Sequence, residues 1–181
     1  MHALPDSFRR IIDGETVRIG VHDSRVIVGR GHSPEHACLL SHKLGVLISG
    51  DQVLPRISSN VSVFPTEPNA DALGDWIESI AHLLVLLPTH GEPSRGLYAR
   101  LDRLARGHDR GLQRLRRSLA DSPKHAIDVF SALFARPMDS NGHLLVLATG
   151  ESLAHINYLP ARGEAARRRA RPGRTVCAVT G

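Results

Sequence analysis

The sequence predicts an α/β protein with a strand-rich N-terminal part and a helical C-terminal part. Within residues 15–49, short runs rich in Val, Ile and Leu are separated by polar turns, a pattern typical of β-strands. From residue 71 onward, apolar residues recur at spacings of three and four, which is typical of amphipathic helices. The order of these two patterns along the chain predicts the fold class.

Four strands are expected in the N-terminal part, at residues 16–19, 25–28, 37–40 and 46–49. A polar turn at 22–24 would join the first two strands. The strands show little alternation between apolar and polar residues, which predicts that both faces of their sheet are covered. The three prolines within residues 52–69 predict a long loop, and loops of this length in compact domains tend to be functional.

The C-terminal part is expected to be helical, with a short strand possible at residues 84–87 before Pro88. The stripe from Ser94 to Leu119 fits either one long helix or a broken pair, with Gly107 and Gly111 at the break. Ser122 and Pro123 are typical of a helix start. The expected helices lie at 71–84, 94–119, 127–134 and 143–159.

The composition is that of a soluble globular protein, with 41% hydrophobic and 23% charged residues. The apolar runs are too short to span a bilayer, and no signal peptide is visible at the N-terminus. Cys38 and Cys177 are the only cysteines and form no disulfide framework, so a cytoplasmic location is expected. Cys38 lies in an apolar run and is expected to be buried.

The net charge of +5 comes from the C-terminal end of the chain. Residues 162–181 hold six arginines and one glutamate, whereas residues 1–161 hold equal numbers of basic and acidic residues. This end has no aromatic residues interleaved for base stacking, so it is weak evidence for nucleic-acid binding. A disordered basic tail is expected over residues 166–181.

Three glycine-containing turns at predicted strand ends each carry a histidine or an aspartate: residues 31–36, 49–55 and 87–93. Their side chains His32, Asp51 and His90 are candidate metal ligands, because two imidazoles and a carboxylate suit a cation such as zinc. Glycine beside a ligand allows a sharp turn and a close approach. Taken singly, each residue also fits a structural role in its turn, as a hydrogen-bonded histidine, an Asx-turn aspartate or a helix cap.

Together, the turns Gly31-His32-Ser33-Pro34-Glu35-His36, Ser49-Gly50-Asp51 and Pro88-Thr89-His90-Gly91 resemble the later metal motifs of the metallo-β-lactamase-fold hydrolases. The resemblance implies half of an αββα sandwich. It also implies two zinc ions, with His32 as a ligand of the first, Asp51 as the bridge and His90 as a ligand of the second. His36 would pack nearby without binding metal.

The resemblance extends to the segment from Ile127 to Leu159, which is similar to the winged-helix extension of one branch of the family. The expected organisation is therefore a metallo-β-lactamase-like part over residues 1–110, a helical, winged-helix-like module over 111–165 and the tail over 166–181. His108 falls on the apolar stripe and is the histidine outside the metal motifs most expected to be buried.

The family signature His-x-His-x-Asp-His is absent from the chain. The expected function is a zinc hydrolase in which a metal-bound hydroxide attacks an ester, thioester or phosphodiester, with weak or absent activity in this chain alone. Self-association or docking to a separate N-terminal half is expected, without membrane binding. The alternatives are a nucleic-acid-binding helical module with a basic tail, or an inert gene fragment.

Overall fold

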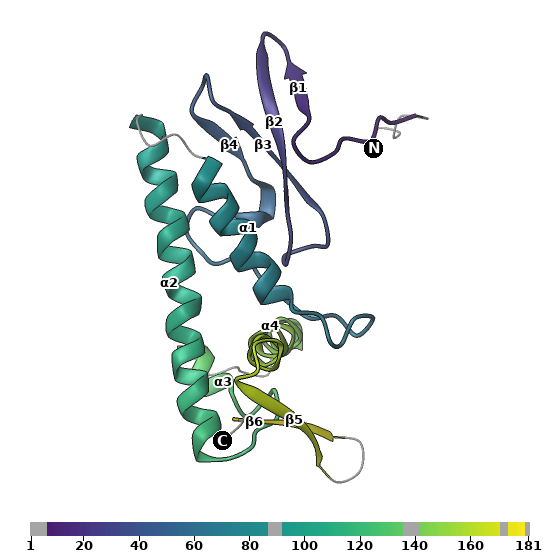
Figure 1. The fold of residues 1–181 in the computed structure, drawn as a ribbon, viewed down its shortest axis with the longest axis vertical. Coiled ribbons are helices and arrows are strands. Elements are labelled where there is room, and N and C mark those ends of the chain that lie inside the picture. The colour runs from purple at the N-terminus through teal and green to yellow at the C-terminus, as the bar shows by residue number, and fades with distance from the viewer. Residues whose placement is uncertain (1–6, 87–91, 136–141, 171–173, 180–181) are drawn as a thin grey trace.

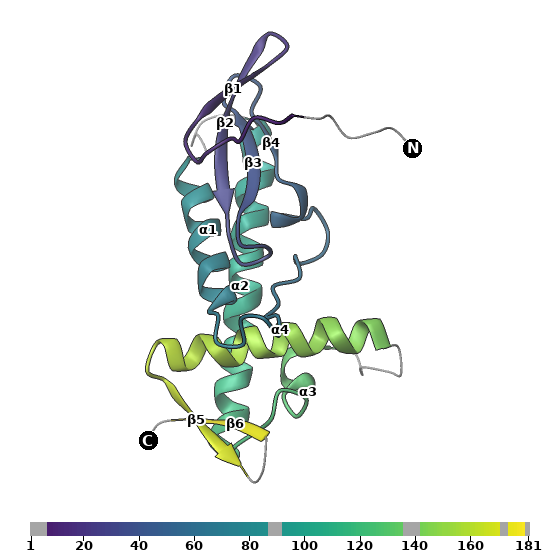
Figure 2. The ribbon, with the colours of Figure 1, turned by 90° about the vertical axis from the view of Figure 1, so that its right-hand side faces the viewer.

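The computed structural model describes residues 7–86, 92–135, 142–170 and 174–179. A four-stranded sheet lies against two helices at one end of the molecule, and two further helices and a hairpin lie at the other end (Figure 1). One long helix runs through both ends, and the last helix crosses it (Figure 2). The structure confirms the predicted α/β fold class.

The sheet consists of β1 (Thr16–Ile19), β2 (His22–Gly29), β3 (His36–Ser41) and β4 (Val46–Ile48), antiparallel and in that order. The four predicted strands are therefore confirmed. The first turn lies elsewhere than predicted, because β2 already begins at His22. The turn uses Gly20, whose φ of 61° is accessible to glycine without steric cost, and this moves it ahead of the polar residues 22–24.

Helix α1 (Ala72–Leu86) packs on β2 and closes the main core. Trp76, Ile80 and Leu83 are each at most 1% exposed, at spacings of four and three. The strand considered possible at 84–87 is wrong, because residues 84–86 continue this helix. Residue 87 lies outside the described residues.

Helix α2 (Glu92–Asp121) is one continuous helix, so the broken-pair alternative is wrong. Gly107 and Gly111 each destabilise a helix by about 1 kcal/mol relative to alanine. Each buried leucine stabilises it by roughly 1.5–3 kcal/mol, which outweighs the glycines. The expected boundary between residues 110 and 111 falls inside this helix. Its buried stripe consists of Leu101, Leu104, Leu112, Leu115 and Leu119.

Helix α3 (Phe130–Leu133) is shorter than the predicted 127–134, because the segment 124–129 before it forms a β-bridge and turns instead. Lys124 and Cys177 exchange two backbone hydrogen bonds of 3.0 Å, which hold that segment against the C-terminal strand. Helix α4 (Gly142–Ala161) confirms the helix predicted at 143–159, with Pro160 in its last turn.

The C-terminal segment forms an antiparallel hairpin of β5 (Ala165–Ala170) and β6 (Arg174–Val179). The disordered tail expected over 166–181 is therefore wrong for these two strands. Ala165, Cys177 and Ala178 are buried, so small side chains pack the hairpin against the helices. The winged-helix assignment of residues 111–165 stays a prediction.

The four-stranded sheet is covered on both faces only near its centre. Val26 and Ile27, neighbours on β2 that point to opposite faces, are both buried. The edge strands instead expose Ile19, Val46 and Ile48 at 48%, 47% and 58%. The prediction of coverage on both faces is thus wrong for β1 and β4. Among the described residues, no helix is long and apolar enough to cross a lipid bilayer.

Candidate metal centre

His32 is held in place by the glycine before it. Gly31 has a φ of 92°, and a Cβ at this position would lie 2.4 Å from both the Ala72 carbonyl oxygen and the Trp76 Cβ. Only glycine allows the chain after β2 to pass this close to the start of α1. The sequence predicts that glycine beside a candidate ligand allows a sharp turn and a close backbone approach, and Gly31 confirms this next to His32.

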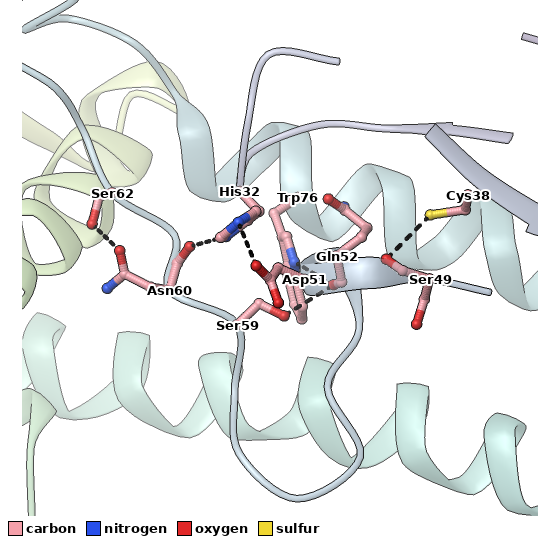
Figure 3. Close-up of polar contacts among 9 residues, drawn as sticks. All are labelled: His32, Cys38, Ser49, Asp51, Gln52, Ser59, Asn60, Ser62 and Trp76. Carbon is pink, nitrogen blue, oxygen red and sulfur yellow. Dashed lines mark hydrogen bonds and ion pairs between the residues drawn. The ribbon is translucent and has the colours of Figure 1, made fainter. Parts of the chain in front are cut away.

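Asp51 lies on the short 3-10 helix η1 (Gly50–Gln52) that follows β4. Gly50 has a φ of 47°, and a Cβ there would lie 2.5 Å from the His36 Nε2. The next residue, Gln52, is fully buried, and its Nε2 donates a 2.9 Å hydrogen bond to the Arg30 carbonyl. With Gln52 directed inward, the Asp51 side chain is 67% exposed and extends toward His32 (Figure 3).

The hydrogen bonds of His32 define which ring nitrogen faces the carboxylate. Its Nδ1 lies 2.8 Å from the Asn60 carbonyl oxygen, which can only accept, so Nδ1 carries the proton. In the neutral ring the Nε2 atom is then unprotonated and has a lone pair available, and it lies 3.9 Å from the Asp51 Oδ2 (Figure 3). Two ligand atoms about 2 Å from one tetrahedral zinc ion lie about 3.3 Å apart, so this pair would have to close by about 0.6 Å to share a metal ion.

The loop at residues 58–62 supports this arrangement from one side (Figure 3). The Ser59 hydroxyl and the Trp76 indole both donate to the Gln52 carbonyl, at 3.0 and 3.2 Å. The Ser62 hydroxyl donates to the Asn60 Oδ1 at 2.5 Å. These contacts fix the Asn60 backbone, and Asn60 in turn fixes the His32 ring.

His36 packs beside the pair, as expected. Its ring makes an edge contact with the His32 ring at a centroid distance of 5.7 Å, and it fills the space above Gly50. The third candidate ligand, His90, lies outside the described residues. Within those residues no group of three or more His, Cys, Asp or Glu side chains is close enough to hold a metal ion.

A cavity of about 540 Å³ opens beside His32, between the turn after β2, the loop at 62–72 and the start of α1. A second, mainly apolar cavity of about 570 Å³ lies between the same loop and α4. The two cavities share Ser62, Phe64 and Pro68 in their walls. A polar site with an imidazole therefore borders directly on an apolar groove.

A buried polar cluster lies where α2 meets α4, and only one of its residues was predicted to be buried. His108 was expected to be buried, which is confirmed, but His155 is buried as well, and their rings stack at 5.3 Å. The His108 Nε2 lies 3.1 Å from the Ser58 hydroxyl. Burial, with a smaller contribution from His155, lowers the pKa of His108 to about 3. Burial also raises the pKa of the Glu151 carboxyl to about 7.

Comparison with known proteins finds similarity to metallo-β-lactamase-like proteins. Residues 112–175 match the family described as metallo-beta-lactamase-like, C-terminal domain. The crystal structure of a beta-lactamase domain protein from Burkholderia ambifaria is 41% identical, with a TM-score of 0.88, and covers 98% of this chain. That of a metallo-beta-lactamase family protein from Thermus thermophilus is 27% identical, with a TM-score of 0.78, and covers 97%.

Two curated proteins are also similar. A probable metallo-hydrolase of Bacillus subtilis is 27% identical over 78% of this chain, and an atrochrysone carboxyl ACP thioesterase of Aspergillus fumigatus is 28% identical over 64%. The chain spans 54% and 56% of the two solved structures, and 46% and 27% of these two curated relatives. With this fold and these matches, the chain corresponds to the C-terminal half of the metallo-β-lactamase-like fold.

Proposed function

We propose that His32 and Asp51, with His90, form part of the zinc centre of a hydrolase that cleaves an acyl ester or thioester. The observation that carries this proposal is the His32 ring, whose Nδ1 is held by the Asn60 carbonyl while Nε2 faces the Asp51 carboxylate at 3.9 Å. Metal-binding histidines typically donate their second ring nitrogen to a carbonyl in this way. The arrangement therefore suits a ligand pair better than an isolated ion pair.

A zinc ion in such a site supplies a hydroxide nucleophile near neutral pH and polarises the oxygen that is attacked. The chain's own residues orient the reacting groups. Asn60 keeps His32 in one tautomer, and the Asp51 carboxylate faces the Nε2 of that ring at 3.9 Å. The shape of the loop at 62–72 determines which substrates reach His32.

An acyl substrate is favoured over a phosphodiester by the apolar groove that borders the polar cavity. Phe64 and Val146 line this groove and expose their apolar side chains, which suit the acyl chain of an ester or thioester. One of the similar curated proteins is named as a thioesterase, which agrees with this choice. A phosphodiester remains the second candidate for the same metal chemistry.

Activity of this chain alone is expected to be weak or absent. A catalytic zinc site normally has three protein ligands and an open position. His32 and Asp51 supply two, and in the family geometry His90 serves the other metal. We therefore expect the remaining ligands to come from an N-terminal half of the fold, docked beside the exposed side chains of β1 and β4.

The proposal is tested by zinc titration of the purified chain against a chromophoric chelator. Wild type is expected to bind zinc at micromolar or weaker affinity, and the variants His32→Ala and Asp51→Ala are expected to lose at least about tenfold, since each removes a ligand. His82→Ala serves as the control, because His82 is exposed on α1, away from the pair. Equal affinity of His32→Ala and wild type would contradict the assignment.

A further inference from the structure

Helix α4 crosses α2 (Figure 2), and a separate hollow of about 280 Å³ lies at this crossing, with Ser58 in its wall. Neither His32 nor Asp51 lines it. Its wall contains the buried pair His108 and His155, and three arginines stand around it. This hollow is therefore distinct from the cavity beside His32.

The floor of the hollow is bare helix backbone. Gly107 and Gly111 are one turn apart on α2 and both line the hollow. A Cβ at Gly107 would meet no atom within 4 Å, and one at Gly111 would make ordinary contacts with the His155 ring at 3.6 Å and the Leu133 side chain at 3.8 Å. Packing therefore does not require glycine at either position, although glycine disfavours the middle of a helix. The absence of a side chain at both positions keeps the hollow open.

The rim of the hollow is cationic. Arg100 donates to the carbonyls of Leu54 and Ile57 at 2.7 and 2.6 Å, which fixes its guanidinium without neutralising it. Arg114 is fixed in the same way by the carbonyls of Ala132 and Leu133, at 2.6 and 3.3 Å.

The third guanidinium, that of Arg103, is exposed on α2. In the described part of the chain, no carboxylate is paired with any of the three arginines. Burial and the nearby charge of Arg103 lower the pKa of Arg100, which agrees with positive charge concentrated here.

The other titratable groups in the wall offset this charge only in part. Burial lowers the pKa of His108 to about 3 and also lowers the pKa of His155, so both rings are neutral at physiological pH. Among the described residues of the wall Glu151 is the only acidic one, and burial raises the pKa of its carboxyl to about 7. It therefore offsets at most one of the three guanidinium charges, and less as the pH falls below about 7. A concave site with a net charge concentrates small ions of the opposite sign.

We propose that this hollow is an anion-binding site that takes the phosphoryl group of a small molecule, held by Arg100 and Arg103, which stand one turn apart on α2 near Gly107. Arg114 also comes from α2 but lies about 21 Å farther along the helix axis than Arg100, so it adds positive charge to the hollow from a distance. A phosphoryl group offers at least three oxygen acceptors, so it can accept from both guanidiniums at once.

The test uses the full chain and inorganic phosphate, titrated by calorimetry at constant ionic strength and pH 7.5. Arg103→Gln is expected to weaken phosphate binding by about tenfold, as for the loss of one charge-assisted hydrogen bond. Arg110→Gln is the matched control, because Arg110 is also exposed on α2 and does not line the hollow. This control is expected to change the affinity less than twofold.

A second variant separates a shaped site from a merely basic helix. Gly107→Leu keeps every charge but fills the open space, so it is expected to abolish phosphate binding while its circular dichroism spectrum stays helical. Coenzyme A and a short single-stranded RNA are compared at several salt concentrations. Phosphate or coenzyme A binding that Gly107→Leu abolishes supports the proposal. Absence of phosphate binding at millimolar concentration, or RNA binding weakened equally by Arg103→Gln and Arg110→Gln, would overturn it.

Discussion

Two buried histidines have their tautomers set by a single carbonyl. The His155 Nδ1 lies 2.8 Å from the Glu151 carbonyl oxygen and must donate to it, so His155 Nε2 accepts from His108 Nδ1 at 3.3 Å. The His108 Nε2 is then left to accept the hydroxyl proton of Ser58. This one-directional chain ties the loop at 52–69 to α2 and α4, and it requires both rings to be neutral, as their lowered pKa values allow.

Glu151 gives a pH dependence that can be isolated by substitution. Burial raises the pKa of its carboxyl from 4.5 to about 7, so the folded state holds this proton more tightly than the unfolded state. The stability contributed by Glu151 is therefore present below about pH 4.5 and is lost as the pH rises to about 7. Glu151→Gln should remove this loss, which amounts to at most about 3 kcal/mol. Urea unfolding at pH 5 and pH 8 measures it.

In that experiment the free energy of unfolding of Glu151→Gln, relative to wild type, should increase between pH 5 and pH 8. His108 acts in the opposite direction in both proteins, because its lowered pKa makes stability fall as the pH falls below about 6.5. The difference between variant and wild type cancels this contribution. A difference that is constant with pH would show that the Glu151 carboxyl titrates normally.

At the scale of the elements, the turn before His32 depends on the absence of a side chain at Gly31. Gly31→Ala places a methyl group 2.4 Å from the backbone of α1 at a φ of 92°, and should destabilise the protein by at least about 2 kcal/mol. Gly20→Ala is the control: Gly20 also has a positive φ, but nothing lies within 4 Å, so only about 1 kcal/mol is expected. Equal losses in urea unfolding would contradict the close approach.

In helix α2, a glycine substitution is expected to stabilise the protein rather than destabilise it. Gly107 is helical and its Cβ would meet open space, so Gly107→Ala should stabilise the protein by about 0.5–1 kcal/mol. Thermal unfolding monitored by circular dichroism measures the gain. A loss of stability would contradict the unstrained helical backbone that the structure has at Gly107.

The elements show where sequence patterns suffice and where they do not. The strands and the helix α4 could be predicted from hydrophobic runs and periodicity, because each of these elements buries the apolar residues that form its pattern. The continuity of α2 could not be decided from two glycines, since it depends on how many leucines its neighbours bury. The hairpin β5–β6 was missed because its arginines resemble a solvated tail, while its attachment relies on small residues such as Ala165 and Cys177.

For the molecule as a whole, the candidate site was partly predictable. The glycine-bounded turns indicated His32 and Asp51, and the fold brings them to 3.9 Å. The supporting carbonyl of Asn60 could not be predicted, because it comes from a loop whose path depends on buried contacts of Gln52 and Trp76. The cluster around His155 was missed because a histidine on a helix carries no pattern that marks burial.

The exposed edge of the sheet leads to a prediction about association. Ile48 on β4 is 58% exposed beside other apolar residues, so the isolated chain should self-associate as its concentration rises. Ile48→Asp should shift this equilibrium toward monomer in sedimentation velocity. Ile127→Asp, at a similarly exposed position near α3, should leave it unchanged. Equal effects of the two variants would contradict an interface on the sheet.

The central claim is that this half of a metallo-β-lactamase fold carries an incomplete metal centre built around His32 and Asp51. Zinc retained after dialysis tests it directly, for the chain alone and for the chain mixed with an N-terminal half of a relative that bears the His-x-His-x-Asp-His motif. The account predicts well under one equivalent alone, close to two in the mixture, and loss of that gain in His32→Ala. Tight stoichiometric zinc in the chain alone, or no gain on mixing, would contradict it.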